Sequence, residues 1–454
     1  MSLQHKLKSF GKGGVHPNPN KLTADNPIQG MPLPKSVSLF LSQHIGAPAK
    51  CIVKPNDVVK AGQMVAEAGG FVSAPVHTPI AGKVKKIDKV RDGQGLWKEC
   101  ILIEAEPTEE GSHIQQFVAY DETAPLRSEE EIAALSPKEI IDIVAEAGIV
   151  GLGGASFPTR VKLSIPPWKS ADLFLINGAE CEPYLTCDDI LMRTYTRQIL
   201  DGISYLMRAA GTQEAIIGIE ANKQTAIERL RNEVSSYGNI SVVPLKTMYP
   251  QGSEKQLIYA LTGRVVPTGG LPVDAGVIVD NVATAFAVER AVRYGEPLMK
   301  RVVTVTGPNV SRPGNYLVAT GTSSEEVIAF AGGIPENTGK IISGGPMMGR
   351  AMSCIDAPMA KANGGILLLP EEMSNRAEPL PCIRCAKCVA ACPMNLEPYF
   401  LEILGEFDQI VEAKEHGALN CLECGCCSYV CPSNRPILDY IRLARQKIRN
   451  LPRE

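Results

Sequence analysis

The stretch AGIVGLGGASFPTRVKL, residues 147–163, decides how the central part of this chain is expected to fold. It places four glycines between Gly148 and Gly154, and glycines this dense let a backbone turn tightly and approach a ligand closely. A glycine loop that opens a helix presents free backbone N–H groups to an anion, and Lys162 adds a point charge suited to a phosphate. The plain alternative is a glycine-rich turn, because short glycine motifs often occur without a ligand.

The residues that follow this loop indicate a strand that ends at a binding site. The apolar run Asp172–Ile176 is typical of a buried strand. It leads into NGAECEP, residues 177–183, which contains two acidic side chains. Ligands of open α/β sheets bind just beyond the carboxyl ends of the strands, so this acidic run lies where a cofactor is expected. A solvated acidic loop is the alternative interpretation.

Together the two runs resemble the flavin loop of the NADH-oxidising flavoprotein subunit of respiratory complex I. The matching positions are Gly151, Gly153, Gly154, Ala155, Phe157, Pro158, Thr159, Lys162, Asn177, Glu180, Glu182 and Pro183. The resemblance implies that these residues bind FMN and admit NADH beside it, with Phe157 as a stacking face. Three positions depart from the pattern: Ala179 replaces an aspartate, and Ser156 and Arg160 replace glycines.

Two later segments are similar to the same family. These are YPQGSE, residues 249–254, and DNVAT, residues 280–284, whose counterparts face the flavin or the dinucleotide. The resemblance adds Tyr249, Glu254, Asn281 and Thr284 to the site, and Glu182 and Glu254 are expected to orient the dinucleotide. Ser253 and Asp280 depart from the pattern. Taken without the glycine loop, a turn followed by the start of a helix explains these segments equally well.

Length and composition restrict the class of protein. A chain of 454 residues is long enough for about three domains, and its 44% hydrophobic content is ordinary for a globular protein. The net charge of −3 and the lack of a basic stripe give no reason to expect nucleic acid. No apolar run reaches the roughly 20 residues needed to cross a bilayer. Fourteen cysteines in a large chain without a secretory signal indicate metal ligands.

The N-terminal third is predicted to hold an extended arm and a β-rich unit. Residues 1–34 lack periodicity and are expected to form the arm. Residues 35–120 resemble the two hairpins of a lipoyl or biotinyl carrier domain, which predicts a β-sandwich of the barrel-sandwich hybrid type. A carrier domain needs a lysine at the tip between its hairpins. The tip here is AGGF, residues 68–71, so we expect a domain used for docking.

The middle of the chain is predicted to be α/β. A helix that begins at Pro137 leads into the glycine loop, and beyond Asp189 helices and strands alternate, with a strand at 215–219 and a helix at 223–235. This alternation favours a parallel sheet covered by helices, which predicts a Rossmann-like domain for FMN and NADH over residues 121–298. Residues 299–360 resemble the small β-grasp SLBB domain that follows the flavin domain in complex I.

Cysteines dominate the last predicted domain, residues 361–454. The motif C-x-x-C-x-x-C-x-x-x-C-P occurs twice, which is the spacing by which two-cluster bacterial ferredoxins bind [4Fe–4S] clusters. In those proteins the fourth cysteine of each motif ligates the other cluster. We therefore assign Cys382, Cys385, Cys388 and Cys431 to one cluster and Cys421, Cys424, Cys427 and Cys392 to the other. Zinc is the alternative, but zinc sites usually show two C-x-x-C pairs.

The order of these units resembles the C subunit of the Rnf complexes over essentially the whole chain. That family is the NAD(H)-facing peripheral subunit of a membrane-bound ferredoxin:NAD oxidoreductase that couples electron flow to cation transport. The resemblance implies an oxidoreductase subunit with FMN, two [4Fe–4S] clusters and NAD(H) as substrate, at the cytoplasmic face of the cell membrane. Its implied partners are other Rnf subunits, including membrane-embedded ones and the ferredoxin-like B subunit, with ferredoxin as an indirect partner.

Two alternatives stay open at this point. A cobalamin reductase of microcompartments shares the flavin and cluster modules, although it usually begins near the glycine loop. A docking and electron-wiring subunit without flavin is the second alternative. No general base is expected for the flavin chemistry, because hydride moves directly between nicotinamide and flavin.

Overall fold

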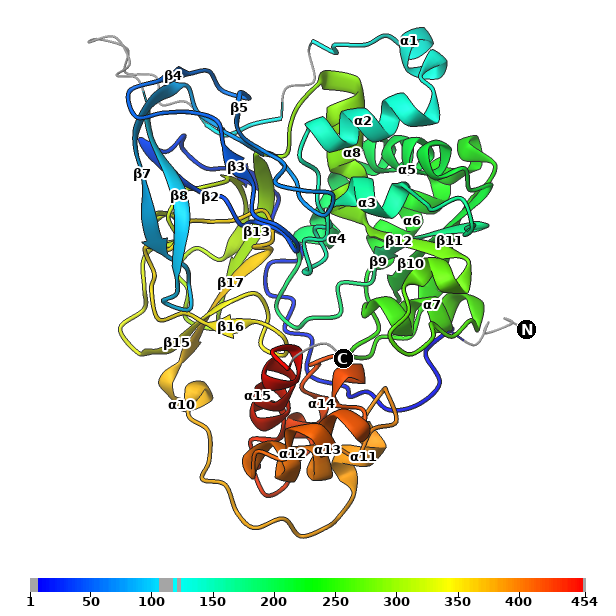
Figure 1. Ribbon diagram of the computed structural model, residues 1–454, viewed down its shortest axis with the longest axis vertical. Coiled ribbons are helices and arrows are strands. Elements are labelled where there is room, and N and C mark those ends of the chain that lie inside the picture. Colours follow the sequence, from blue (N-terminus) through cyan, green and yellow to red (C-terminus); the bar gives the residue numbers. More distant parts are fainter. Residues whose placement is uncertain (1–6, 106–116, 121–123, 452–454) are drawn as a thin grey trace.

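The computed structural model describes residues 7–105, 117–120 and 124–451. These residues form four structural units that pack against one another. A helical unit at the C-terminal end lies beneath an α/β unit and two β-rich units, and the N-terminal arm runs between them (Figure 1). The first six residues of the predicted arm and the predicted boundary at Asp121 lie outside the described residues. No described helix is long and apolar enough to cross a membrane.

The α/β unit is built on a four-stranded parallel sheet, as the alternation of helices and strands predicted. Its strands, in spatial order, are β11 (Ile240–Leu245), β10 (Glu214–Glu220), β9 (Leu173–Gly178) and β12 (Val277–Asn281). The chain passes from β9 outward to β11 and then returns to the other side of β9 as β12. The strand order therefore reverses between β9 and β12, which is where ligands bind in open α/β sheets.

Seven helices of this unit flank the sheet. They are α2 (Pro137–Glu146), α3 (Thr159–Leu163), α4 (Cys187–Thr194), α5 (Thr196–Ala210), α6 (Gln224–Val234), α7 (Glu254–Thr262) and α8 (Val282–Tyr294). The helix predicted to begin at Pro137 is confirmed as α2, which Ser136 and Glu139 start with a capping box. Its buried Ile140 and Val144 fix the direction in which the chain enters the glycine loop.

The barrel-sandwich unit consists of two small sheets. One contains β2 (Ser36–Phe40), β8 (Trp97–Ala105), β7 (Gly82–Arg91) and β4 (Val58–Val59), and the other β3 (Lys50–Cys51), β5 (Met64–Glu67) and β6 (Val76–His77). Its tip lies against the α/β unit, because Arg160 Nη2 donates to Phe71 O at 2.7 Å and Ile45 N donates to Ser156 O at 3.3 Å. The docking role expected for this domain stays a prediction.

A six-stranded sheet forms the third unit. Its order is β1 (Ile28–Gly30), β14 (Gly314–Ala319), β13 (Lys300–Thr306), β17 (Gly365–Pro370), β15 (Thr338–Ser343) and β16 (Arg350–Ala351), with α9 (Ser324–Phe330) packed on it. Strand β13 and helix α9 lie within residues 299–360, which were predicted to form the SLBB domain. Strand β1 comes from the arm and pairs in parallel with β14, and β17 lies beyond the predicted boundary at residue 360.

The C-terminal unit is helical. It contains α11 (Lys387–Ala391), α12 (Pro398–Glu406), α13 (Ile410–Glu415), α14 (Cys426–Tyr429) and α15 (Ile437–Arg449), whereas α10 (Glu371–Ser374) packs against β15 and β17. Helices α12 and α13 lie between the two cysteine motifs. The described chain also contains α1 (Glu129–Ala134) and three single-turn 3-10 helices, Ser235–Tyr237, Pro272–Ala275 and Ala418–Asn420.

Candidate functional site

The site forms where the ends of β9 and β12 meet. Asn177 and Asn281 lie opposite each other in the strand register. Asn281 Nδ2 donates to Asp188 Oδ2 at 2.7 Å and to Asn177 O at 3.3 Å, while Asn177 Nδ2 donates to Gly252 O at 2.7 Å. Both predicted asparagines therefore lie where the strand order reverses, and their hydrogen bonds join the segments that surround the site.

The glycine loop, residues 148–157, crosses the end of the sheet above these asparagines. Gly151 N donates to Phe157 O at 2.8 Å and closes the loop, and Leu152 N donates to Thr284 Oγ1 at 2.9 Å and ties it to α8. Gly153 and Gly154 remain exposed. At Gly154 the backbone has φ +128° and a side chain would meet no atom within 4 Å. The structure thus presents an open stretch of backbone beside the predicted site.

A cation and an unpaired carboxylate oxygen lie next to that stretch. Lys162 Nζ donates to Val279 O at 2.7 Å and lies 3.5 Å from Asp280 Oδ1. Asp280 is buried, and its Oδ2 has no hydrogen-bond partner among the described residues. Burial raises the pKa of Asp280, and the ammonium group of Lys162 opposes that rise. An ammonium group beside an unpaired acceptor fits a ligand with a phosphate and sugar hydroxyls, such as FMN.

The acidic loop, residues 179–186, connects β9 to α4 and is also fixed by hydrogen bonds. Glu180 has a left-handed backbone with φ 45°, and its Oε1 accepts the N–H of Asp188 at 2.7 Å. Glu182 accepts the N–H groups of Met347 and Met348 at 3.1 and 2.7 Å. Burial raises the pKa of Glu182 to about 7. The carboxylate of Glu182 thus binds the segment after β15, although it was predicted to orient the dinucleotide.

The two residues from the later segment lie apart from each other. Tyr249 is buried, and its hydroxyl donates to Cys424 O at 2.9 Å, so it joins the α/β unit to the helical unit. Glu254 begins α7 and keeps an exposed side chain at the rim of the site. Burial of its carboxyl group by neighbouring atoms raises the pKa of Glu254, and Lys162 opposes this.

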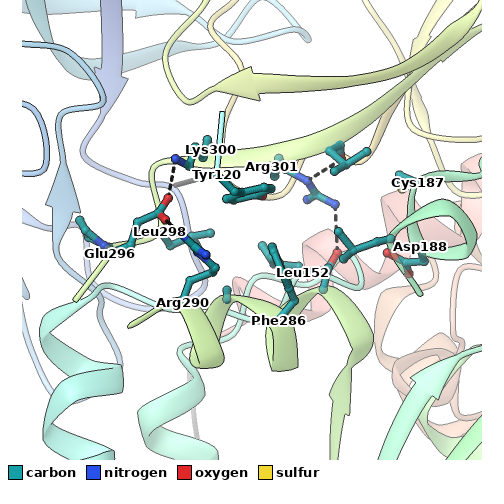
Figure 2. Close-up of a pocket in the computed structure, with 15 residues that line it drawn as sticks. Tyr120, Leu152, Cys187, Asp188, Phe286, Arg290, Glu296, Leu298, Lys300 and Arg301 are labelled. Carbon is teal, nitrogen blue, oxygen red and sulfur yellow. Dashed lines mark hydrogen bonds and ion pairs between the residues drawn. The ribbon is translucent and has the colours of Figure 1, made fainter. Parts of the chain in front are cut away.

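Cations from other units hold the glycine loop from its far side, and sequence reasoning missed them. Figure 2 shows a cavity between α8 and β13, lined by Leu152 and Asp188 on one side and by Tyr120, Arg290 and Lys300 on the other. Arg301 reaches Leu152 O at 3.5 Å and Lys361 O at 2.7 Å. Lys361 Nζ donates to Gly148 O at 2.7 Å. An isolated lysine or arginine in a strand or loop has no sequence pattern that predicts such a role.

The second cysteine motif encloses a cavity together with one cysteine of the first. The cysteines that line this cavity are Cys392, Cys421, Cys424, Cys426 and Cys427. Cys431 does not line it. Cys431 instead lies near Cys388: burial is the main cause that raises the pKa of the Cys388 thiol, and the charge of Cys431 adds a smaller contribution. The ligand assignment stays a prediction, and this crossed grouping supports it.

The two cysteine motifs also share their backbone conformation. Residues with left-handed φ angles occur at the same three places of each motif: Arg384, Ala386 and Asn395 in the first, and Glu423, Gly425 and Asn434 in the second. Repetition of such uncommon angles indicates two loops wrapped around objects of the same shape. Cys382 and Cys385 are exposed, whereas Cys424 and Cys427 are buried.

Comparison with known proteins agrees with this division into units. Family models match for the Nuo51 FMN-binding domain over residues 144–290 and for a 4Fe-4S dicluster domain over residues 374–432. Models for the RnfC barrel sandwich hybrid domain and the SLBB domain match residues 9–108 and 302–351. These matches, with the site geometry, define a flavin and iron–sulfur electron-transfer protein whose cofactors are FMN and [4Fe–4S] clusters.

Relatives match the chain over nearly its full length. The C subunit of the proton-translocating ferredoxin:NAD(+) oxidoreductase complex of Clostridium ljungdahlii is 44% identical over 446 residues, covering 98% of this chain and 94% of that protein. The corresponding subunit of the Na(+)-translocating complex of Acetobacterium woodii is 41% identical and covers 96% of both chains. The C subunit of an ion-translocating oxidoreductase complex from Rhodobacter capsulatus is 42% identical, over 98% and 85%. The chain belongs to this family of C subunits of ion-translocating oxidoreductase complexes, and the resemblance noted in the sequence is confirmed.

Proposed function

We propose that this chain is the NAD(H)-facing subunit of a membrane-bound ferredoxin:NAD+ oxidoreductase complex that couples electron flow to cation translocation. One observation supports this most strongly. The unit that holds the open glycine loop is joined to the unit that holds the five-cysteine cavity, because the Tyr249 hydroxyl donates to Cys424 O. Such a junction brings a two-electron site next to a one-electron carrier.

In this proposal the exposed backbone of Gly153 and Gly154 and the ammonium group of Lys162 hold FMN, with Asn177 and Asn281 fixing the walls. Bound FMN supplies the exchange between a hydride, which carries two electrons, and the single electrons that an iron–sulfur cluster accepts. Phe157 lies at the turn of the loop and offers a partly exposed ring for stacking. Glu254, an exposed residue at the start of α7, is the carboxylate that we assign to the dinucleotide.

The contacts also suggest the order of the clusters. Cys181 of the acidic loop packs in one apolar group with Tyr249, Cys424 and Cys426. The cluster assigned to Cys424 therefore receives electrons first. The cluster assigned to Cys382 and Cys385 lies at the exposed end and passes them to a partner. Each electron transfer requires only a short distance between donor and acceptor. A buried first cluster and an exposed second cluster therefore suit these roles.

The partners and the location follow from the same proposal. We assign the exposed cluster to contact with the ferredoxin-like B subunit and assign the remaining surface to membrane-embedded subunits, at the cytoplasmic face of the membrane. The finer fold assignments belong here too: a Rossmann-like FMN domain, a β-grasp arrangement in the six-stranded sheet and a two-cluster ferredoxin-like domain.

The experiment is anaerobic spectroscopy of the full chain with reconstituted clusters. We expect acid precipitation to release about one FMN per chain and NADH to bleach the flavin band. A chain that binds clusters but no flavin would instead be a docking and electron-wiring subunit. Comparison of a ferredoxin with cob(III)alamin as partner separates the remaining alternative, because a cobalamin reductase would reduce cobalamin and exchange no electrons with ferredoxin.

A further inference from the structure

A lysine of the N-terminal arm is hydrogen-bonded to the acidic loop. Lys21 Nζ donates to the carbonyl oxygens of Glu180 at 2.9 Å, Glu182 at 2.9 Å and Leu185 at 2.6 Å. Three acceptors use all three protons of its ammonium group. The Lys21 side chain is only 17% exposed, and a flexible surface lysine would not be held in this way. The arm therefore determines the path of this loop.

The acidic loop needs such support because of its own backbone. Glu180 and Tyr184 have left-handed φ angles of 45° and 70°, which cost free energy for residues other than glycine. These angles turn three carbonyl groups toward one point. The arm supplies a second tie, since Tyr184 N donates to Pro19 O at 2.9 Å. Without Lys21 the three carbonyls would lose the donor that they share, and the loop would open.

Lys21 also balances the charge around Glu180. Its Nζ lies 3.9 Å from Glu180 Oε2, which has no hydrogen-bond partner among the described residues. Lys223 donates to Glu180 O at 3.3 Å and pairs with Glu220 at 3.4 Å. The titratable groups around Glu180 are Lys21 from the arm, Lys223 after β10, and Cys187, Asp188 and Asp189 from α4. Loss of Lys21 leaves Glu180 facing mainly other acids.

We propose that Lys21 is a positioning residue for flavin and dinucleotide binding, which acts through the backbone of the acidic loop and the ionisation of Glu180. This inference rests on the proposed function of the site. Under this proposal the N-terminal arm takes part in nucleotide binding, and it also supplies β1 to the six-stranded sheet.

The test compares Lys21→Met and Lys21→Arg with the control Lys12→Met, because Lys12 is an exposed lysine of the same arm. Each full-length protein is reconstituted with clusters, stripped of flavin and titrated with FMN by fluorescence. Reduction of the bound flavin by NADH is then followed by stopped flow between pH 5.5 and 8.5. Cluster content from the EPR of dithionite-reduced protein checks that each variant is folded.

We expect Lys21→Met to keep both clusters while weakening FMN binding or flavin reduction at least about tenfold. The acidic limb of its pH profile should move upward by about one pH unit, because an opposite charge lowers a carboxyl pKa by that order. Lys21→Arg should restore the pH profile in part, and Lys12→Met should match the wild type. A purely structural lysine would not shift the profile.

Two results would overturn the inference, and they are distinguishable from failure of the proposed function. Wild-type values for FMN affinity, rate and pH profile in Lys21→Met would show that the arm does not position the site. If Lys21→Met loses its clusters, the decision rests on Lys21→Gln, which removes the charge but keeps two N–H donors, and wild-type FMN affinity and pH profile there count against the inference. Absence of flavin binding in the wild type would refute the proposed function, and this inference with it.

Discussion

Lys361 offers a quantitative test of the junction between the units. Its side chain is 1% exposed, and its Nζ donates to Pro75 O at 2.8 Å and to Gly148 O at 2.7 Å. The charged or titratable groups that face it are His44, His77 and, through its own carbonyl group, Arg301. Within the described residues no carboxylate forms an ion pair with it. Burial therefore lowers the pKa of Lys361 from 10.5 to about 7.

The free energy follows from that pKa. A change from 10.5 to about 7, at about 1.4 kcal/mol per pH unit, makes the protonated form roughly 5 kcal/mol more costly in the folded protein than in the unfolded one. The unfolded chain holds this proton up to its normal pKa, whereas the folded chain releases it above about pH 7. The contribution of Lys361 to stability therefore rises with pH between these values, by roughly 2–3 kcal/mol from pH 7 to pH 9. A neutral amine still has two N–H donors for the two carbonyls.

The assay is thermal unfolding of the reconstituted full chain and of Lys361→Met at pH 6.5 and pH 9.0. Relative to the variant, the wild type should gain about 4–10 °C in the transition that separates the β-rich units from the α/β unit. Lys138→Met, which removes an exposed lysine of α2, should leave the pH dependence unchanged. A difference between wild type and Lys361→Met that is the same at both pH values would refute the reasoning, because it would mean that Lys361 keeps its proton.

Three further predictions concern the cofactors. Gly153→Val would place its Cβ 3.3 Å from Asn281 Cβ, so FMN occupancy should fall at least about tenfold while the iron content stays constant; full occupancy would contradict the assignment of the loop. NADH should reduce the flavin faster than NADPH, because Arg160 is held by Phe71 O and is not free for a 2′-phosphate; equal rates under anaerobic conditions would count against this. Cys431→Ser should abolish the EPR signal of the cluster held by Cys382 and its neighbours and stop transfer to ferredoxin, whereas NADH:ferricyanide activity should persist. Loss of the other signal alone would refute the crossed ligands.

Local patterns predicted most of the architecture. The apolar run at 172–176 corresponds to β9, and the helix that begins at Pro137 corresponds to α2. The alternation of helices and strands predicted the parallel sheet because each element buries one face against its neighbour in sequence. The cysteine motif predicted two equivalent loops, and the matching left-handed residues at Arg384 and Glu423 agree with it.

The partners of the predicted site residues could not be predicted, because they come from distant parts of the chain. Glu182 was expected to face the dinucleotide, and its carboxylate binds the amide groups of Met347 and Met348. Tyr249 was expected at the flavin, and its hydroxyl binds Cys424 O. A motif gives the residue type and its place on a strand or loop. The direction of a side chain depends on the units packed around it, and no periodicity encodes them.

Basic side chains that donate hydrogen bonds to the glycine and acidic loops explain why the units depend on one another. Lys21 comes from the arm, Arg301 from β13 and Lys361 from the segment before β17, and each donates to backbone carbonyls of these loops. A buried carbonyl without a donor costs roughly 1–3 kcal/mol, so loss of any one of these units would strain the loops. The α/β unit supplies the residues of the predicted motif, but the other units supply the hydrogen-bond donors that hold those residues in place. The site is therefore a property of the assembled chain.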